Sequence, residues 1–163
     1  MRARDLAVEY ETVTVDTDAL AAARLMASHR LPGLLVLDGQ GAPKAILPAS
    51  QMIRMLVPGY VLEDPALAAV IDEKHADRLC AALRGRTVGA CLPPKAPAPP
   101  VAAPDDTALE VAALMAQQRS PLVAVVERYK DGTATLLGVI TAAHLLDRLL
   151  DAAPPTSPTT PTP

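Results

Sequence analysis

Short apolar runs of strand length alternate with amphipathic stretches of helix length along most of the chain. A β-rich run at residues 12–15 precedes a helical stretch in which apolar side chains at positions 20, 23, 26 and 27 are predicted to form one buried face. Two strands over Gly33–Leu37 and Pro43–Leu47 follow, and then a closing helix over Ala49–Leu56. The pattern predicts a β-α-β-β-α unit.

The same order returns 89 residues later. Leu25 and Met26 align with Leu114 and Met115, and the last strand and the closing helix align after a four-residue insertion. The second copy is predicted to contain, in order, a short strand at 100–103, a helix with apolar positions 109, 112, 115 and 116, strands at Leu122–Glu127 and Thr133–Ile140, and a helix at Ala142–Leu150.

Local signals support these boundaries. Thr107 and Glu110 have the spacing of a capping box, and Asp18 is at the matching cap position of the first copy. Asp131 and Gly132 are typical of a hairpin turn between the last two strands.

The chain therefore divides into repeat one at residues 2–57, a connecting segment at 58–86, repeat two at 87–150 and a disordered Pro/Thr-rich tail at 151–163. Within the connecting segment we expect a helix over Asp64–Leu83, capped by Asp64 and ended by Gly85. The proline-rich stretch Leu92–Pro104 is predicted to be a stiff, extended connector.

The amino-acid composition argues against several classes of protein function. Half of the 163 residues are apolar, Trp and Phe are absent, and the net charge is −3. An acidic chain with three tyrosines as its only aromatic residues lacks the stacking platforms and the positive charge of a nucleic-acid binder. Two cysteines are too few for a disulfide scaffold or a cysteine zinc site. The N-terminus lacks a signal peptide and no apolar run could span a membrane, so we expect a soluble cytoplasmic protein.

The order, spacing and duplication of these elements resemble a tandem pair of CBS (cystathionine-β-synthase) domains, a Bateman module. The resemblance depends on the Asp-rich cap before each first helix, the Ala-x-x-Met of that helix, and the segments Arg30–Asp38, Arg119–Val126 and Leu137–Leu146. It implies an α/β (α+β) fold in which two repeats pack about a pseudo-twofold axis with two clefts between them. Many members bind AMP or ATP there, regulate a partner protein and form flat homodimers.

The family's ligand signature is Gly-x-x-Thr-x-x-Asp before the last helix. Repeat two has Gly138 and Thr141 but His144 in place of Asp, and repeat one has Ala45, Pro48 and Gln51. Loss of both ribose-binding carboxylates predicts weak nucleotide binding or none. His144 is either a partly exposed polar side chain or a ligand contact.

Two arginines at matching helix ends, Arg30 and Arg119, are either solvated charges or anion contacts in the clefts, and Ser120 beside Arg119 is a further ligand candidate. Asp16 and Asp18 match an Asp-x-Asp phosphatase pattern, but the repeat favours a helix cap. An acidic and histidine-containing set is interpreted as a solvated helix face rather than a metal site; it comprises Asp72, Glu73, His75 and Asp77.

No triad, paired-carboxylate motif or phosphate loop is present, so we expect no enzyme activity and no metal. Two functions remain open. The first is a stand-alone regulator that binds a small metabolite, with AMP or ATP as candidates, and acts on a separate protein. The second is an interaction module with empty clefts, such as an accessory subunit of a transporter or enzyme. The closing helices are more apolar than one buried stripe requires, which predicts a homodimer.

Overall fold

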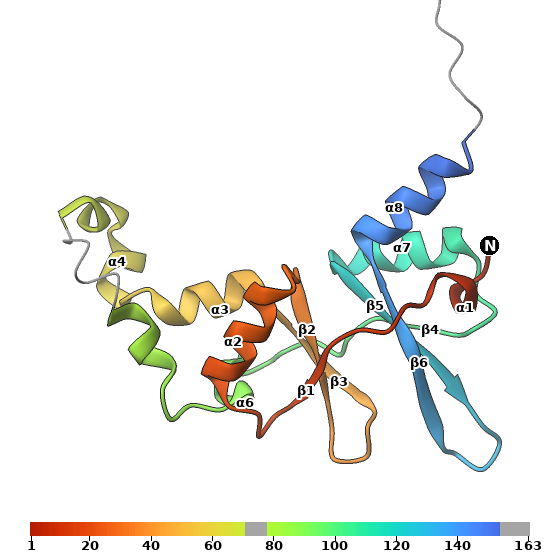
Figure 1. Cartoon of the computed structure of the whole chain (residues 1–163), viewed down its shortest axis with the longest axis horizontal. Coiled ribbons are helices and arrows are strands. Elements are labelled where there is room, and N and C mark those ends of the chain that lie inside the picture. Colours follow the sequence, from red (N-terminus) through yellow and green to blue (C-terminus); the bar gives the residue numbers. More distant parts are fainter. Residues whose placement is uncertain (71–77, 154–163) are drawn as a thin grey trace, which may run out of the picture.

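Two three-stranded sheets, one from each repeat, form the centre of the protein (Figure 1). The computed structural model describes residues 1–70 and 78–153. In each sheet the first strand pairs in parallel with the second, and the second pairs antiparallel with the third. The strands are β1 (Thr12–Thr14), β2 (Gly33–Leu37), β3 (Pro43–Pro48), β4 (Val101–Ala102), β5 (Leu122–Arg128) and β6 (Ala134–Thr141). The predicted α/β fold of two β-α-β-β-α repeats is confirmed.

Two helices accompany each sheet, and the first helix of each pair begins at the cap that the sequence predicts. The first sheet carries α2 (Ala19–Ser28) and α3 (Ala49–Leu56), and the second carries α7 (Ala108–Gln118) and α8 (Ala142–Asp151). The Ala21 amide donates to Asp18 Oδ2 over 2.9 Å. In the capping box, the Thr107 amide donates to Glu110 Oε2 over 2.7 Å and the Glu110 amide donates to Thr107 Oγ1 over 3.3 Å. Each cap satisfies amides that the first helical turn leaves free.

The predicted buried face of the first helix in each repeat is confirmed at Met26 and Met115 but is displaced by one position in the earlier turns. The buried side chains are Ala19, Ala22 and Met26 in α2, and Ala108, Val111 and Met115 in α7. Leu109, expected inside, is 78 % exposed. The first turn of each helix contacts a crossing backbone segment, because the Ala19 amide donates to Arg86 O and the Ala108 amide donates to Met1 O. A small alanine faces that segment in each helix, and Leu109 turns away from the core whereas Leu20 is partly buried against it.

Each repeat's core is completed by a short helix that the chain order assigns to the other repeat. Helix α1 (Ala3–Leu6) is buried against the second repeat, where Ala3 and Leu6 join Val111 and Met115. Helix α6 (Val88–Cys91) is buried against α2 and α3 of the first repeat. An ion pair between Arg4 and Asp105 also holds α1 to the second repeat. The two repeats therefore depend on each other for their cores.

The connecting segment differs from the single helix predicted over Asp64–Leu83. It contains α4 (Gly59–Glu63) and two 3-10 helices, η1 (Pro65–Val70) and η2 (Cys80–Leu83). Asp64 does act as a cap, since its Oδ1 accepts from the Ala66 amide, and Gly85 adopts a positive φ of 72° after η2. Val70 is 78 % exposed, so η1 has no buried stripe to stabilise a longer helix.

Some predictions lie outside the described residues. They are the middle of the predicted connecting helix, its polar set at Asp72, Glu73, His75 and Asp77, and the tail from residue 154 onward. Helix α8 continues through Asp151, where the tail was expected to begin. None of the helices in the described part of the chain combines the length and the hydrophobicity needed to cross a bilayer.

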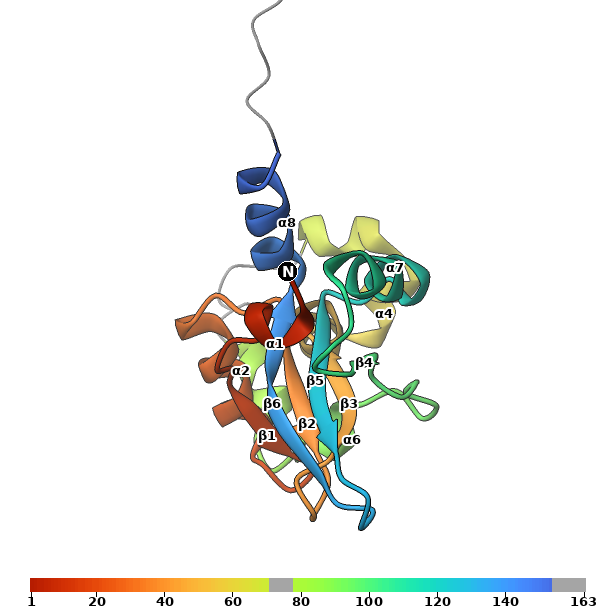
Figure 2. The same cartoon turned by 90° about the vertical axis from the view of Figure 1, so that its right-hand side faces the viewer.

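The two sheets pack on each other through a separate apolar cluster. Leu35 of the first sheet is buried in one cluster with Leu122, Ala124, Val126 and Val139 of the second. Seen along the long axis, the sheets lie one behind the other (Figure 2). This packing places the segment before β1 and the segment before β4 at the two margins of the sheet interface, where the clefts are found.

Candidate ligand clefts between the repeats

The signature residues of repeat two already have structural roles. Thr141 is the last residue of β6 and the cap of α8, and its Oγ1 accepts a hydrogen bond from the His144 amide over 3.1 Å. A Cβ on Gly138 would lie 2.6 Å from the carbonyl oxygen of Val8. Val8 pairs with Val139 through two backbone hydrogen bonds of 3.1 and 2.9 Å. Gly138 is therefore required by the close approach of the N-terminal segment.

His144 lies in the first turn of α8 and is partly exposed. Its backbone amide serves the Thr141 cap, and its ring makes no hydrogen bond to any side chain or backbone group among the described residues. The imidazole is thus the one part of the repeat-two signature that the fold does not use.

The matching residues of repeat one are also engaged in packing. Ala45 is buried, and Pro48 ends β3. The Gln51 side-chain amide donates to the carbonyl oxygen of Cys91 over 3.0 Å, which fastens α3 to α6. The side-chain nitrogen of Gln51 is therefore committed to the fold.

One cleft is lined by both repeats and is named here the proline cleft. It encloses about 210 Å³. Its walls are Ile46 and Pro48 of repeat one, the connector residues Pro93 and Ala96–Pro100, and Gln118–Pro121 of repeat two. Among the predicted ligand residues, the structure brings Arg119 and Ser120 together here.

The pseudo-symmetric counterpart of this cleft is acidic. It encloses about 450 Å³ and is lined by Glu9, Tyr10, Glu11, His29 and Leu31, which align at the 89-residue offset with lining residues of the proline cleft. The Tyr10 hydroxyl donates to the carbonyl oxygen of Gly33 over 2.7 Å, and burial raises the pKa of Tyr10 to about 12. Two carboxylates at this opening disfavour a phosphate group.

Arg30 and Arg119 share an unusual backbone conformation. Their φ values are 52° and 49°, in the left-handed region that glycine favours at helix ends. In both copies the arginine amide and the amide of the next residue donate to carbonyls of the last helical turn. Both side chains line a groove between the two helices of their own repeat, and Arg119 also lines the proline cleft.

Ser120 uses its hydroxyl locally. Its Oγ donates to the carbonyl oxygen of Leu122 over 2.7 Å and accepts from the Leu122 amide over 3.3 Å. The exposed guanidinium of Arg119 makes no ion pair with the described residues. Arg119 is therefore the free charged group of the proline cleft.

Two groups of lining residues escaped the sequence analysis. Tyr10 and the connector prolines precede the first strand of each repeat, outside the signature. The 89-residue offset aligns Tyr10 with Pro99, and this alignment could have identified both segments as equivalent cleft walls.

Comparison with known proteins identifies the family. The CBS-domain model matches residues 3–57 and 96–151. The chain belongs to the CBS-domain family. A CBS domain-containing protein of unknown function from Kribbella flavida DSM 17836 is 47 % identical, with 92 % of this chain and 99 % of that chain covered and a TM-score of 0.79.

More distant CBS proteins share the fold. The CBS domain of a membrane protein from Sphaerobacter thermophilus is 26 % identical, with 90 % of this chain and 86 % of that chain covered and a TM-score of 0.63. CBSX2, solved in complex with AMP, is 18 % identical, with 92 % and 96 % covered and a TM-score of 0.62. No curated protein matches the chain.

Proposed function

We propose that this CBS pair is a non-catalytic cytoplasmic regulator that holds a small anionic metabolite in the proline cleft and modulates a separate protein partner as a homodimer. The observation that carries the proposal is the free guanidinium of Arg119 in a cleft lined by both repeats. A ligand held there touches Ile46 and Pro48 on one side and the repeat-two helix end on the other, so its binding favours one relative position of the repeats.

The dimensions of the cleft limit its ligand. A volume of about 210 Å³ is below the roughly 300–1,000 Å³ that is usual for ligand pockets. Gln51 and His144 also replace the carboxylates that would bind a ribose diol. AMP, which CBSX2 binds, and ATP are therefore expected to bind this chain weakly, and a smaller anion fits better.

The test compares wild-type protein with Arg119→Gln in thermal unfolding and calorimetry, using inorganic phosphate, AMP and ATP as probes. A probe at a hundred times its dissociation constant adds about 2.7 kcal/mol of stability, or about 5–10 °C in Tm for a chain of this size. Arg119→Gln should abolish the shift, and Lys130→Gln on the distant hairpin should preserve it. A shift that persists in Arg119→Gln would place the ligand elsewhere.

A second function, that of an interaction module with empty clefts, is favoured by the packing and capping roles of the signature residues. Thr141, Gly138 and Gln51 all contribute to packing or capping, so they can be retained without any ligand. In an interaction module with empty clefts, none of the three probes would shift the Tm, whereas dimer formation would persist. The same unfolding experiment therefore separates the two functions.

A further inference from the structure

An apolar groove on the helices of the first repeat shares no lining residue with the proline cleft. It encloses about 640 Å³ between α2, α3 and η2, and is named here the η2 groove. Met26, Met52 and Leu83 form its floor, and each of them is at most 5 % exposed. Because Leu83 belongs to η2, the connecting segment supplies a third wall beside the two helices.

The second repeat has a corresponding groove that lacks such a third wall. That groove encloses about 480 Å³, and its lining comes from α7, α8 and the link at residues 119–121. The connecting segment therefore makes the η2 groove the larger and the more enclosed of the two.

The lining of the η2 groove is apolar apart from three side chains, Arg24, Arg30 and Cys80. Both arginines are exposed, and neither forms an ion pair with the described residues. The described lining residues include no carboxylate. The groove thus combines an apolar interior with two free positive charges at its rim.

These features indicate the chemistry of a ligand. A volume of about 640 Å³ is within the roughly 300–1,000 Å³ that is usual for small-molecule pockets. Apolar walls offer no partner to the hydroxyl groups of a sugar or to the polar edge of a base, so burial of such groups there is costly. An unbranched apolar chain gives up no hydrogen bond on burial, and a carboxylate at its end pairs with a guanidinium through two hydrogen bonds.

We propose that the η2 groove binds a fatty acid, with its chain along Met26 and Met52 and its carboxylate at Arg24 and Arg30. The groove is a second ligand site, separate from the anion site of the proposed function. Cys80 reports directly on its occupancy, because the Cys80 thiol lies at the groove and is exposed, whereas Cys91 is buried.

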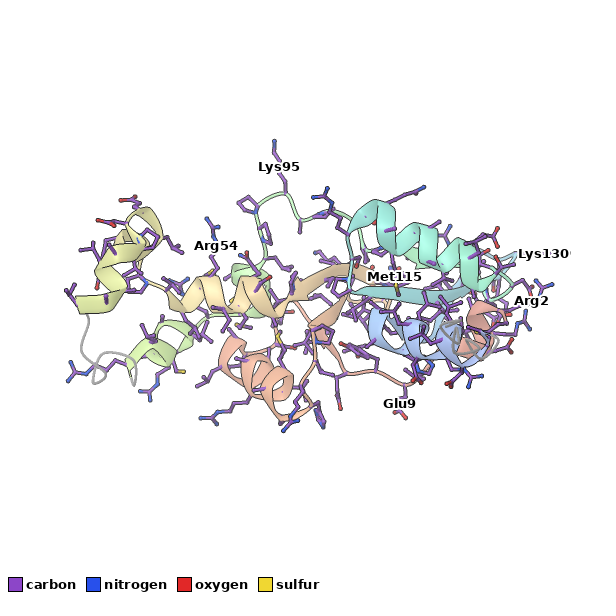
Figure 3. All side chains as sticks on the ribbon, turned by 90° about the horizontal axis from the view of Figure 1, so that it is seen from above. Arg2, Glu9, Arg54, Lys95, Met115 and Lys130 are labelled. Atoms are coloured by element: carbon purple, nitrogen blue, oxygen red, sulfur yellow. The ribbon has the colours of Figure 1, made fainter. Side chains whose placement is uncertain are left out.

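Calorimetry measures the binding of octanoate, decanoate and laurate to the full chain. Each buried methylene group is worth about fourfold in affinity, so each two-carbon extension should tighten binding by about tenfold or more. Arg24→Gln and Arg30→Gln should each weaken laurate binding about two- to fivefold, the range for exposed ion pairs. The matched control is Arg54→Gln, because Arg54 does not line the groove and extends from α3 on the side opposite α2 (Figure 3).

Alkylation of Cys80 by N-ethylmaleimide, followed by mass spectrometry, locates the bound chain. Saturating laurate should slow the reaction of Cys80 severalfold. Ala27→Trp places a large side chain at an exposed lining position and should remove both the binding and the protection. Ala116→Trp makes the same change at the equivalent exposed position of α7 and should preserve both. Circular dichroism melting verifies that each variant folds.

The possible failures are distinguishable. A wild type that binds no laurate, or binds it without slowing Cys80 alkylation, would overturn the fatty-acid site, whereas the phosphate and nucleotide probes test the proline cleft independently. Equal affinity for laurate and dodecyltrimethylammonium would overturn the role of Arg24 and Arg30. Laurate binding that is kept in Ala27→Trp and lost in Ala116→Trp would place the ligand between α7 and α8 and overturn the assignment to the η2 groove.

Discussion

Gly138→Ala tests the exchange of N-terminal segments between the repeats. The added methyl group would lie 2.6 Å from Val8 O and 3.1 Å from Val8 C. Both are backbone atoms, so the clash cannot be relieved by a rotamer change. The N-terminal segment must move away from β6, which also strains its attachment through the fully buried Leu6.

The expected loss in the free energy of unfolding is estimated from the contacts that the added methyl group would disturb. Overpacking a well-packed position costs about 1–3 kcal/mol. Each of the two backbone hydrogen bonds between Val8 and Val139 contributes about 0.5–1.5 kcal/mol net. Because the segment can relax part of the clash by giving up these bonds, we expect a loss of about 2–4 kcal/mol in the free energy of unfolding.

Urea denaturation monitored by circular dichroism measures this loss, with Gly39→Ala as the control. A Cβ on Gly39 has no neighbour within 4 Å, so that change should stay within about 0.5 kcal/mol of wild type. In a double-mutant cycle, Leu6→Ala and Gly138→Ala should be less destabilising together than their sum, because both loosen one segment. Equal midpoints for Gly138→Ala and Gly39→Ala would refute the reasoning.

Three further predictions follow from the clefts. Arg119→Gly should raise the free energy of unfolding by about 0.5–1 kcal/mol, since glycine relieves the left-handed backbone, and Arg30→Gly should do the same; an unchanged Tm would contradict this. Burial raises the pKa of Tyr10 to about 12, above its unfolded value near 10, so the stability from the neutral phenol is complete below pH 10 and is lost as pH rises to 12. Urea titrations at pH 9 and pH 11.5 measure this loss, and the free energy of unfolding should fall less between the two pH values in Tyr10→Phe than in the wild type. His144→Asp should strengthen AMP binding about tenfold or more by calorimetry, and no gain would show that the signature site no longer accepts a ribose.

The parts of the fold that the sequence predicts are those whose causes are local. The capping box of Thr107 and Glu110 operates within one helical turn, and the hairpin at Asp131–Gly132 closes with Gly132 at a φ of 86°. Because the sequence is duplicated, an element predicted in one copy also predicts the equivalent element in the other. Strand order and the pairing of β1 with β2 follow from such local units because each sheet is assembled within one repeat.

The parts that escaped prediction depend on distant contacts. Residues 2–11 carry charges that are typical of a solvated segment, yet Ala3 and Leu6 between them are fully buried in the second repeat. The faces of α2 and α7 were misplaced in their first turns because the crossing backbone at Met1 and Arg86 determines which side of the turn is covered. The signature spacing did locate Gly138 and Thr141, but it could not reveal that each is required by the fold.

One difference in sequence between the repeats affects the backbone beside the third strand of each sheet. Val8 donates its amide to Val139 and closes the N-terminal segment onto β6, so Gly138 must lack a side chain. At the 89-residue offset the residue equivalent to Val8 is Pro97, which has no amide hydrogen and cannot form that bond with β3.

The connector therefore lacks this pairing with β3, and Pro97 lines the proline cleft together with Ile46. Without a backbone pressed against β3, a side chain at the position equivalent to Gly138 is tolerated, and Ala45 is found there. A proline at one position thus removes the backbone pairing at β3 and releases repeat one from the glycine that repeat two still needs.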